Sequence, residues 1–293
     1  MIDCCRSILT IAILLGSSAW GSQAAAQVFG PPAALNPNAA TDSGDDFSPQ
    51  VASDGAGNWL AVWDSTDSLG ATLGSDSDIL LSRSSDAGVS WTAPAALNRN
   101  AATDSGNDSS PQISTDRAGN WLAVWDSTDS LGATLGSDSD ILVSRSSDAG
   151  VSWTAPAALN RNAATDSGND SSPQISTDRA GNWLAVWTSD DSLSATLGSD
   201  SDILVSRSSN AGASWTALAA FNSNAATDSG FDFSPQVTTD GSGNWLVVWN
   251  SDDTLGATLG TDTDILYSTR SIRPHSALGF RPPAPEIIVP VDE

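Results

Sequence analysis

The sequence has little cysteine, and what it has lies outside the expected mature chain. Its two cysteines, Cys4 and Cys5, precede an apolar run at residues 8–15. The run follows Arg6 and leads to three successive alanines at residues 24–26, so residues 1–26 have the pattern of a secretory signal peptide. After cleavage no cysteine remains, which excludes disulfides and a thiol nucleophile. We expect a secreted or periplasmic protein without a membrane span, because no later apolar run is long enough to cross a bilayer.

Lysine is absent, and glutamate occurs only at Glu286 and Glu293, near the C-terminus. The eleven basic residues are all arginine, nearly all of the acid is aspartate, and the formal net charge is −24. Nucleic acids and anionic membranes require clustered lysine and arginine, so neither is expected as a partner. So many carboxylates favour divalent cations or basic partners. The alternative is that the aspartates only keep an exported protein soluble.

The remaining sequence repeats itself every 62 residues. The segment Gly-Asn-Trp-Leu-Ala-Val-Trp places its first tryptophan at Trp59, Trp121 and Trp183, and a variant of it places Trp245 at the same position. Residues 82–125 recur unchanged as residues 144–187, which indicates recent duplication. Such self-similarity predicts a repeat architecture in which each copy packs against its neighbours.

Each repeat predicts four short strands separated by turn residues. In the second repeat, Trp121, Ala123 and Trp125 share one face of the expected second strand, and Leu122 and Val124 share the other. Apolar residues on both faces indicate a strand that is covered on both sides. Four strands per repeat around a tryptophan-rich core predict an all-β protein, a β-propeller with one blade per repeat. A β-solenoid is the structural alternative. The four strands are expected at residues 112–115, 121–125, 141–145 and 154–159.

The ends of the repeated region predict how the blades close. Residues 32–36 match the fourth strand of a blade, as at residues 94–98, whereas the last repeat has only its first three strands. Together these segments supply sixteen strands, so we expect four four-stranded blades in which the N-terminal strand closes the last blade. An open arc that self-associates, or a dimer of arcs, is the alternative. The propeller is expected over residues 27–271, followed by a proline-rich tail over 272–293.

A second motif lies in the turn before the expected fourth strand. The pattern S-x-D-x-G-x-x-W occurs at residues 84–91 and 146–153, and residues 208–215 carry it with Asn210 in place of the aspartate. This pattern resembles the Asp-box, or BNR repeat, of the sialidase superfamily of β-propellers. In that family the motif is a structural element on the face away from the active site. The resemblance therefore implies that Asp86 and Asp148 are folding residues, whose carboxylates accept hydrogen bonds from the turn.

The resemblance does not extend to the catalytic residues of sialidases. Those enzymes hold the substrate carboxylate with three arginines, use a tyrosine paired with a glutamate as the nucleophile, and use an aspartate as acid/base. Here the only tyrosine is Tyr267, and no repeat contains a glutamate. Arg83, Arg145 and Arg207 recur once per repeat, but they lie just before the Asp-box and are expected to pair with nearby aspartates. We therefore expect no catalytic residues, with a sialidase-like glycoside hydrolase as the alternative.

Acidic residues recur in two other loops of every repeat, the loop between the second and third strands and the connection to the next repeat. Because strand direction alternates, both loops lie on the face opposite the Asp-box. Oxygen ligands without histidine favour Ca²⁺ over zinc or iron. The alternative is that these residues only cap turns and solvate loops. The candidate metal ligands are Asp76, Asp78, Asp104, Asp108, Asp138, Asp140, Asp166, Asp170, Asp200, Asp202, Asp262 and Asp264.

Near-identical loops favour a binding role over catalysis, because a unique catalytic pocket needs blades that differ from one another. The sequence thus predicts a secreted, non-catalytic binding or scaffolding propeller. Its expected cofactor is Ca²⁺ at most, and its expected partner is an extracellular glycan or protein.

Overall fold

The computed structural model describes residues 30–271, which contain fifteen strands and no helix. The expected signal peptide (residues 1–26) and the expected tail (272–293), which contains His275, lie outside the described residues. The compact unit that carries the strands begins at Ala34. No helix within residues 30–271 is long and apolar enough to cross a membrane.

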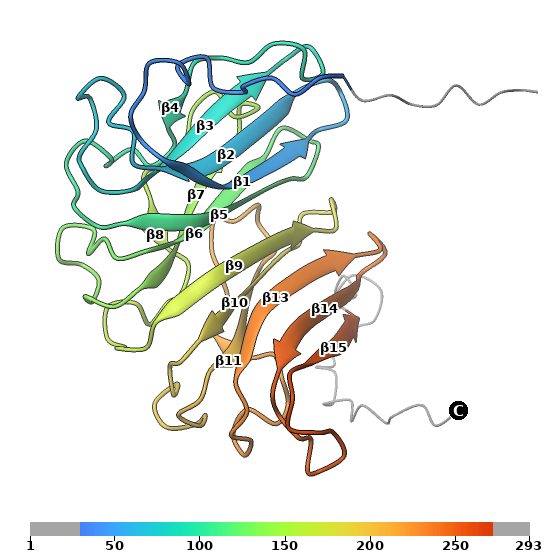
Figure 1. The fold of residues 1–293 in the computed structure, drawn as a ribbon. Helices are drawn as coiled ribbons and strands as arrows, with labels where there is room; N and C mark the ends of the chain where they lie inside the picture. Colours follow the sequence, from blue (N-terminus) through green and yellow to red (C-terminus); the bar gives the residue numbers. More distant parts are fainter. Residues whose placement is uncertain (1–29, 272–293) are drawn as a thin grey trace, which may run out of the picture. The chain divides into compact units, whose positions relative to one another are not determined.

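The strands form four antiparallel sheets, one for each repeat, and within each sheet they are hydrogen-bonded in chain order (Figure 1). The first sheet contains β1 (Asp46–Ser53), β2 (Trp59–Ser65), β3 (Asp78–Ser84) and β4 (Ala95–Ala96). The second contains β5 (Asp108–Thr115), β6 (Trp121–Ser127), β7 (Asp140–Ser146) and β8 (Ala157–Ala158). The third contains β9 (Asp170–Thr177), β10 (Trp183–Ser189), β11 (Asp202–Ser208) and β12 (Ala219–Ala220). The last contains β13 (Asp232–Thr239), β14 (Asn244–Ser251) and β15 (Asp264–Ser271). This is the strand order of propeller blades, as the sequence predicted.

The hydrophobic core lies between consecutive sheets. Leu60 and Ile79 of the first sheet pack in one cluster with Trp121 and Trp125 of the second, and all four side chains are at most 1% exposed. The same contacts recur between the second and third sheets and between the third and the last. Both faces of β6 carry apolar side chains because each face packs in a different core. One face packs against the preceding sheet, and the other packs against the following sheet.

The first strand of each sheet contains a bulge at its Ser-Pro pair. The register between β5 and β6 shifts between Ser109 and Gln112, and Ser110 has a φ of 53°. Proline has no N–H to donate to the ladder, so within a sheet it is tolerated at such a bulge. Ser110, Pro111 and Gln112 at this bulge line the pocket described below.

The prediction that an N-terminal strand closes the last blade is wrong for the described residues. Residues 32–36 form no strand, and the last sheet has three strands rather than four. Leu35 packs against the first sheet with Trp63 and Leu80, and Asn36 donates a hydrogen bond to Asp46 at 3.0 Å. The physical reason is the shortness of the fourth strand. At β4 only Ala95 and Ala96 pair with β3, so a strand of this kind contributes too few backbone hydrogen bonds to bring the first and last sheets together.

Candidate metal centres

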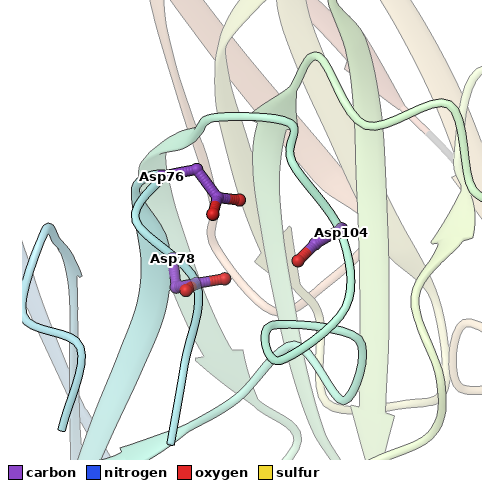
Figure 2. A group of neighbouring side chains, drawn as sticks. All are labelled: Asp76, Asp78 and Asp104. Carbon is purple, nitrogen blue, oxygen red and sulfur yellow. The ribbon is translucent and has the colours of Figure 1, made fainter. Parts of the chain in front are cut away.

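Three groups of aspartates converge at the junctions between consecutive sheets. At the first junction, Asp76 and Asp78 come from the end of the loop between β2 and β3, and Asp104 comes from the connection that leads to β5. Figure 2 shows the carboxylates of Asp76 and Asp78 turned toward the segment that carries Asp104. Each residue offers an oxygen that lies within 4.8 Å of the others. The second group is Asp138, Asp140 and Asp166, and the third is Asp200, Asp202 and Asp228.

Hydrogen bonds fix the two segments of the first group against each other. The backbone N–H of Asp108 donates to the carbonyl of Ser77 at 2.8 Å, and the backbone N–H of Ser77 donates to the side-chain oxygen of Asn107 at 3.1 Å. The side-chain amide of Asn98 donates to Oδ1 of Asp78 at 2.8 Å. These contacts join the end of one blade to the start of the next, so the carboxylates are positioned by the blade junction itself.

Several carboxylate oxygens of these groups are buried without a hydrogen-bond donor. Asp140 is 1% exposed, and its Oδ1 accepts a hydrogen bond from Asn160 while its Oδ2 has no partner. Asp170 is 0% exposed, and neither of its carboxylate oxygens accepts a hydrogen bond of good geometry, although the Ser189 hydroxyl and the Trp187 indole lie near enough to lower its pKa against the effect of burial. Oδ2 of Asp138 and Oδ1 of Asp166 are also buried without a donor. A buried acceptor without a donor is costly, and a bound cation is one partner that would satisfy these oxygens.

The pKa values of the clustered aspartates are displaced upward from 3.8. Burial raises the pKa of Asp78 to about 7, with further repulsion from Asp104 and Asp76. Burial raises the pKa of Asp104 to about 6, and it raises that of Asp108 well above the ordinary value with added repulsion from Asp104 and Asp78. The pKa of Asp140 is likewise raised to about 7 by burial. None of these causes is a neighbouring positive charge, so a bound cation would relieve both the burial cost and the mutual repulsion.

The residues present fit a calcium ion. Ca²⁺ takes about 6–8 oxygen ligands at roughly 2.3–2.6 Å, supplied by mono- or bidentate carboxylates, carbonyls and water. Each group offers three convergent carboxylates, and a fourth follows on the first strand of the next sheet, as Asp108 does at the first junction. No histidine or cysteine occurs within residues 30–271, so a zinc site of the usual kind has no ligands there.

Eight of the twelve predicted ligands are brought together in these groups, whereas Asp108, Asp170, Asp262 and Asp264 are not part of them. Asp262 and Asp264 occupy the same positions in the last repeat as Asp76 and Asp78 in the first, yet the described residues bring no third carboxylate to them. Sequence reasoning missed Asp228 and also Asp232, whose pKa is raised to about 7 by burial. The 62-residue period would have found both, because they follow Asp166 and Asp170 at that spacing.

Gly106, between Asp104 and Asp108, lies where no side chain fits. A Cβ at this position would lie 2.3 Å from the backbone nitrogen of Asp129. We therefore expect Gly106→Ala to separate the connection from the β6–β7 loop and to destabilise the protein by about 2 kcal/mol or more, as overpacking does. Thermal melting would measure this effect. Ser105→Ala, a change of an exposed neighbour, is the control and should leave the melting temperature unchanged; equal melting of the two variants would contradict the expected crowding.

The first strands of all four sheets line one pocket. Its volume is about 210 Å³, and its lining consists of the serine, proline and glutamine residues that flank the bulges. Gln112 and Gln174 line it from β5 and β9. Sequence reasoning did not single out this pocket, although the repeated Ser-Pro-Gln segment marks its position.

The Asp-box turns have the structural role that the resemblance implied. Oδ1 of Asp86 accepts a hydrogen bond from the backbone N–H of Ser90 at 2.9 Å, and Oδ2 accepts one from the Ser90 hydroxyl at 2.6 Å. These bonds lower the pKa of Asp86 to about 2. Arg145 does not follow the expected pairing with an aspartate, because its guanidinium donates to the carbonyl of Ala211 in the next blade's turn at 3.3 Å.

Comparison with known proteins shows the fold. No family model and no curated protein matches the chain. Among solved structures, the Hadza microbial sialidase Hz136 has a TM-score of 0.53 and 16% identity over 76% of this chain and 44% of its own. A Dyadobacter fermentans protein of unknown function has a TM-score of 0.50 and 15% identity over 76% of this chain and 65% of its own. The leech intramolecular trans-sialidase has a TM-score of 0.50 and 10% identity over 77% of this chain and 50% of its own. The chain thus spans less than two thirds of each, and its fold is a β-propeller similar to that of sialidases.

Proposed function

We propose that this protein is an exported, non-catalytic binding propeller whose blades are joined by Ca²⁺ and whose ligand is a glycan. The observation that carries the proposal is the threefold recurrence of a partly buried carboxylate group at the blade junctions. Each group connects the end of one blade to the start of the next, so a cation there would stabilise the packing of adjacent sheets.

Binding of a glycan is supported by the pocket at the first strands. Amide and hydroxyl side chains, such as those of Gln112, Gln174 and Ser110, are suited to hydrogen-bond with sugar hydroxyls. The fold is similar to that of sialidases, which act on glycans. The acidic charge disfavours nucleic acid, since phosphates would be repelled.

A non-catalytic role is supported by the equivalence of the blades. The aspartates at the three junctions have closely similar surroundings, so no pair is set apart as an acid and a base with different pKa values. Tyr267, the only tyrosine, lies on the strand at the edge of the last sheet and is 71% exposed. No glutamate occurs among residues 30–271 to activate it.

Calorimetric titration and a glycan array test the two parts of the proposal. Calcium should bind at three sites per chain, and the array should report glycan binding by the calcium-loaded protein. Replacing two pocket glutamines, in Gln112→Ala/Gln174→Ala, should weaken glycan binding about tenfold, because each lost hydrogen bond contributes roughly 0.5–1.5 kcal/mol. Ser85→Ala/Ser147→Ala changes exposed residues of the Asp-box turns and should leave binding unchanged.

The main competing function is sialidase-like hydrolysis, which the similarity to two sialidase structures makes worth measuring. We expect no turnover of a fluorogenic sialoside. Turnover that Tyr267→Phe abolishes would overturn the non-catalytic proposal. An absence of calcium binding in the titration would contradict the part of the proposal that assigns Ca²⁺ to the blade junctions.

A further inference from the structure

The last sheet exposes apolar side chains that every earlier sheet buries. Ile265 is 68% exposed and Tyr267 is 71% exposed on β15. At the same positions in the first repeat, Ile79 is 0% exposed and Leu81 is 6% exposed, because the second sheet covers them. The face of the last sheet formed by Leu246, Ile265 and Tyr267 is here called the tail face.

The first sheet exposes the complementary surface. Val51 on β1 is 56% exposed, whereas Ile113 and Ile175, its equivalents on β5 and β9, are each 9% exposed. In the core between the first two sheets, Ile113 packs in one cluster with Ile79 and Leu81. The surface around Val51 is here called the head face. The head and tail faces are thus the two halves of an interface that already occurs three times within the chain.

Each of these faces also carries half of a carboxylate group. Asp262 and Asp264 occupy the positions of Asp76 and Asp78, and they lie beside the tail face without a third carboxylate among the described residues. Asp42 and Asp46 occupy the positions of Asp104 and Asp108, beside the head face. Asp46 accepts hydrogen bonds from the Trp63 indole at 3.0 Å and the Ser65 hydroxyl at 2.6 Å.

We propose that the tail face of one copy of this chain binds the head face of a second copy, and that the junction contains a fourth carboxylate group made of Asp262 and Asp264 from one copy and Asp42 and Asp46 from the other. The occupant is a second copy because the interface that fits both faces is the blade junction itself. Within residues 30–271, no strand of the first sheet contacts a strand of the last. The shared carboxylate group rests on the proposed calcium function, since the four acids repel one another without a cation.

The proposed contact is head-to-tail, because it joins two different faces of the chain. It therefore predicts how variants of each face behave alone and when mixed. Ile265→Asp damages only the tail face and Val51→Asp damages only the head face. Either variant alone should fail to self-associate, because each contact needs one face of each kind. An equimolar mixture should form a one-to-one complex, since the first variant keeps an intact head face and the second keeps an intact tail face.

Sedimentation velocity of the full chain tests this inference. In calcium the wild-type protein should sediment as a dimer or larger species, and chelator should return it to a monomer. Ser147→Asp, which changes an exposed side chain in the Asp-box turn of the second sheet, outside both faces, is the matched control and should behave as wild type. Asp42→Asn should weaken the association at least tenfold while leaving the binding of calcium at the three internal junctions intact. Circular dichroism would confirm that each variant is folded.

Three results would overturn the inference: a monomer in calcium, self-association by either single-face variant, or association that neither Asp42→Asn nor chelator weakens. Calcium titration of the same samples keeps the two proposals distinguishable. Calcium bound by a chain that stays monomeric contradicts the junction between copies but leaves the proposed function standing.

Discussion

Calcium should raise the melting temperature of this protein by roughly 15 to 30 °C relative to the protein in chelator. A ligand that binds only the folded state stabilises it by about 2.7 kcal/mol per site at a concentration about 100-fold above Kd. Three sites therefore contribute about 8 kcal/mol, and each kcal/mol shifts the melting temperature by roughly 2–4 °C for a domain of this size. The cause is the burial of carboxylates such as Asp140 and Asp170 without counter-charges, with Oδ2 of Asp140 lacking a hydrogen-bond donor as well.

Asparagine substitutions distinguish the effect of bound metal on the melting temperature from the effect of side-chain packing. Asp140→Asn keeps the shape of the side chain and removes its charge, so the variant in chelator should melt no lower than the wild type in chelator. Calcium should raise the melting temperature of this variant less than that of the wild type, by about the contribution of one site. Asp45→Asn removes an exposed carboxylate outside the three groups and should respond to calcium as the wild type does. Identical melting of the wild type in calcium and in chelator would contradict the metal sites.

The pH dependence of stability should reverse when calcium is added. In chelator the clustered aspartates have folded-state pKa values raised above the unfolded value of 3.8, to about 7 for Asp78 and Asp140 and about 6 for Asp104. The stability that their protonation provides is fully present below pH 4 and is lost as the pH rises through 6 to 7. Each unit of raised pKa corresponds to about 1.4 kcal/mol for a fully buried group, but solvent screens these clusters, so the free energy of unfolding should fall by about 1–3 kcal/mol between pH 5 and pH 8.

In calcium the trend should have the opposite sign. The ion binds the deprotonated carboxylates, so its stabilisation is present at pH 8 and is lost as protons compete at pH 5. Urea unfolding at pH 5, 6, 7 and 8, with and without calcium, would measure both slopes. Asp78→Asn/Asp140→Asn should flatten both curves. Parallel curves in the two conditions would show that the clustered acids do not bind the metal.

The sequence determined the blades because the information for each one is local. The 62-residue period, the alternation in Trp121–Ser127 and the turn residues all act within one repeat, so the sheets followed from pattern alone. The candidate ligands were predictable for the same reason. The loop between the second and third strands and the blade connection must share one face when strand direction alternates, and Asp76, Asp78 and Asp104 do meet there.

Only the tertiary structure decided what happens at the ends of the repeat array. Leu35 and Asn36 have the same sequence as the corresponding residues of a fourth strand, but they contact the first sheet instead. A fourth strand of two residues adds few hydrogen bonds, so it does not hold the first and last sheets together. Burial is likewise a property of the assembled sheets. Ile79 and Ile265 stand at equivalent places in the sequence, yet one is fully buried and the other is 68% exposed, because only the first has a following sheet to cover it.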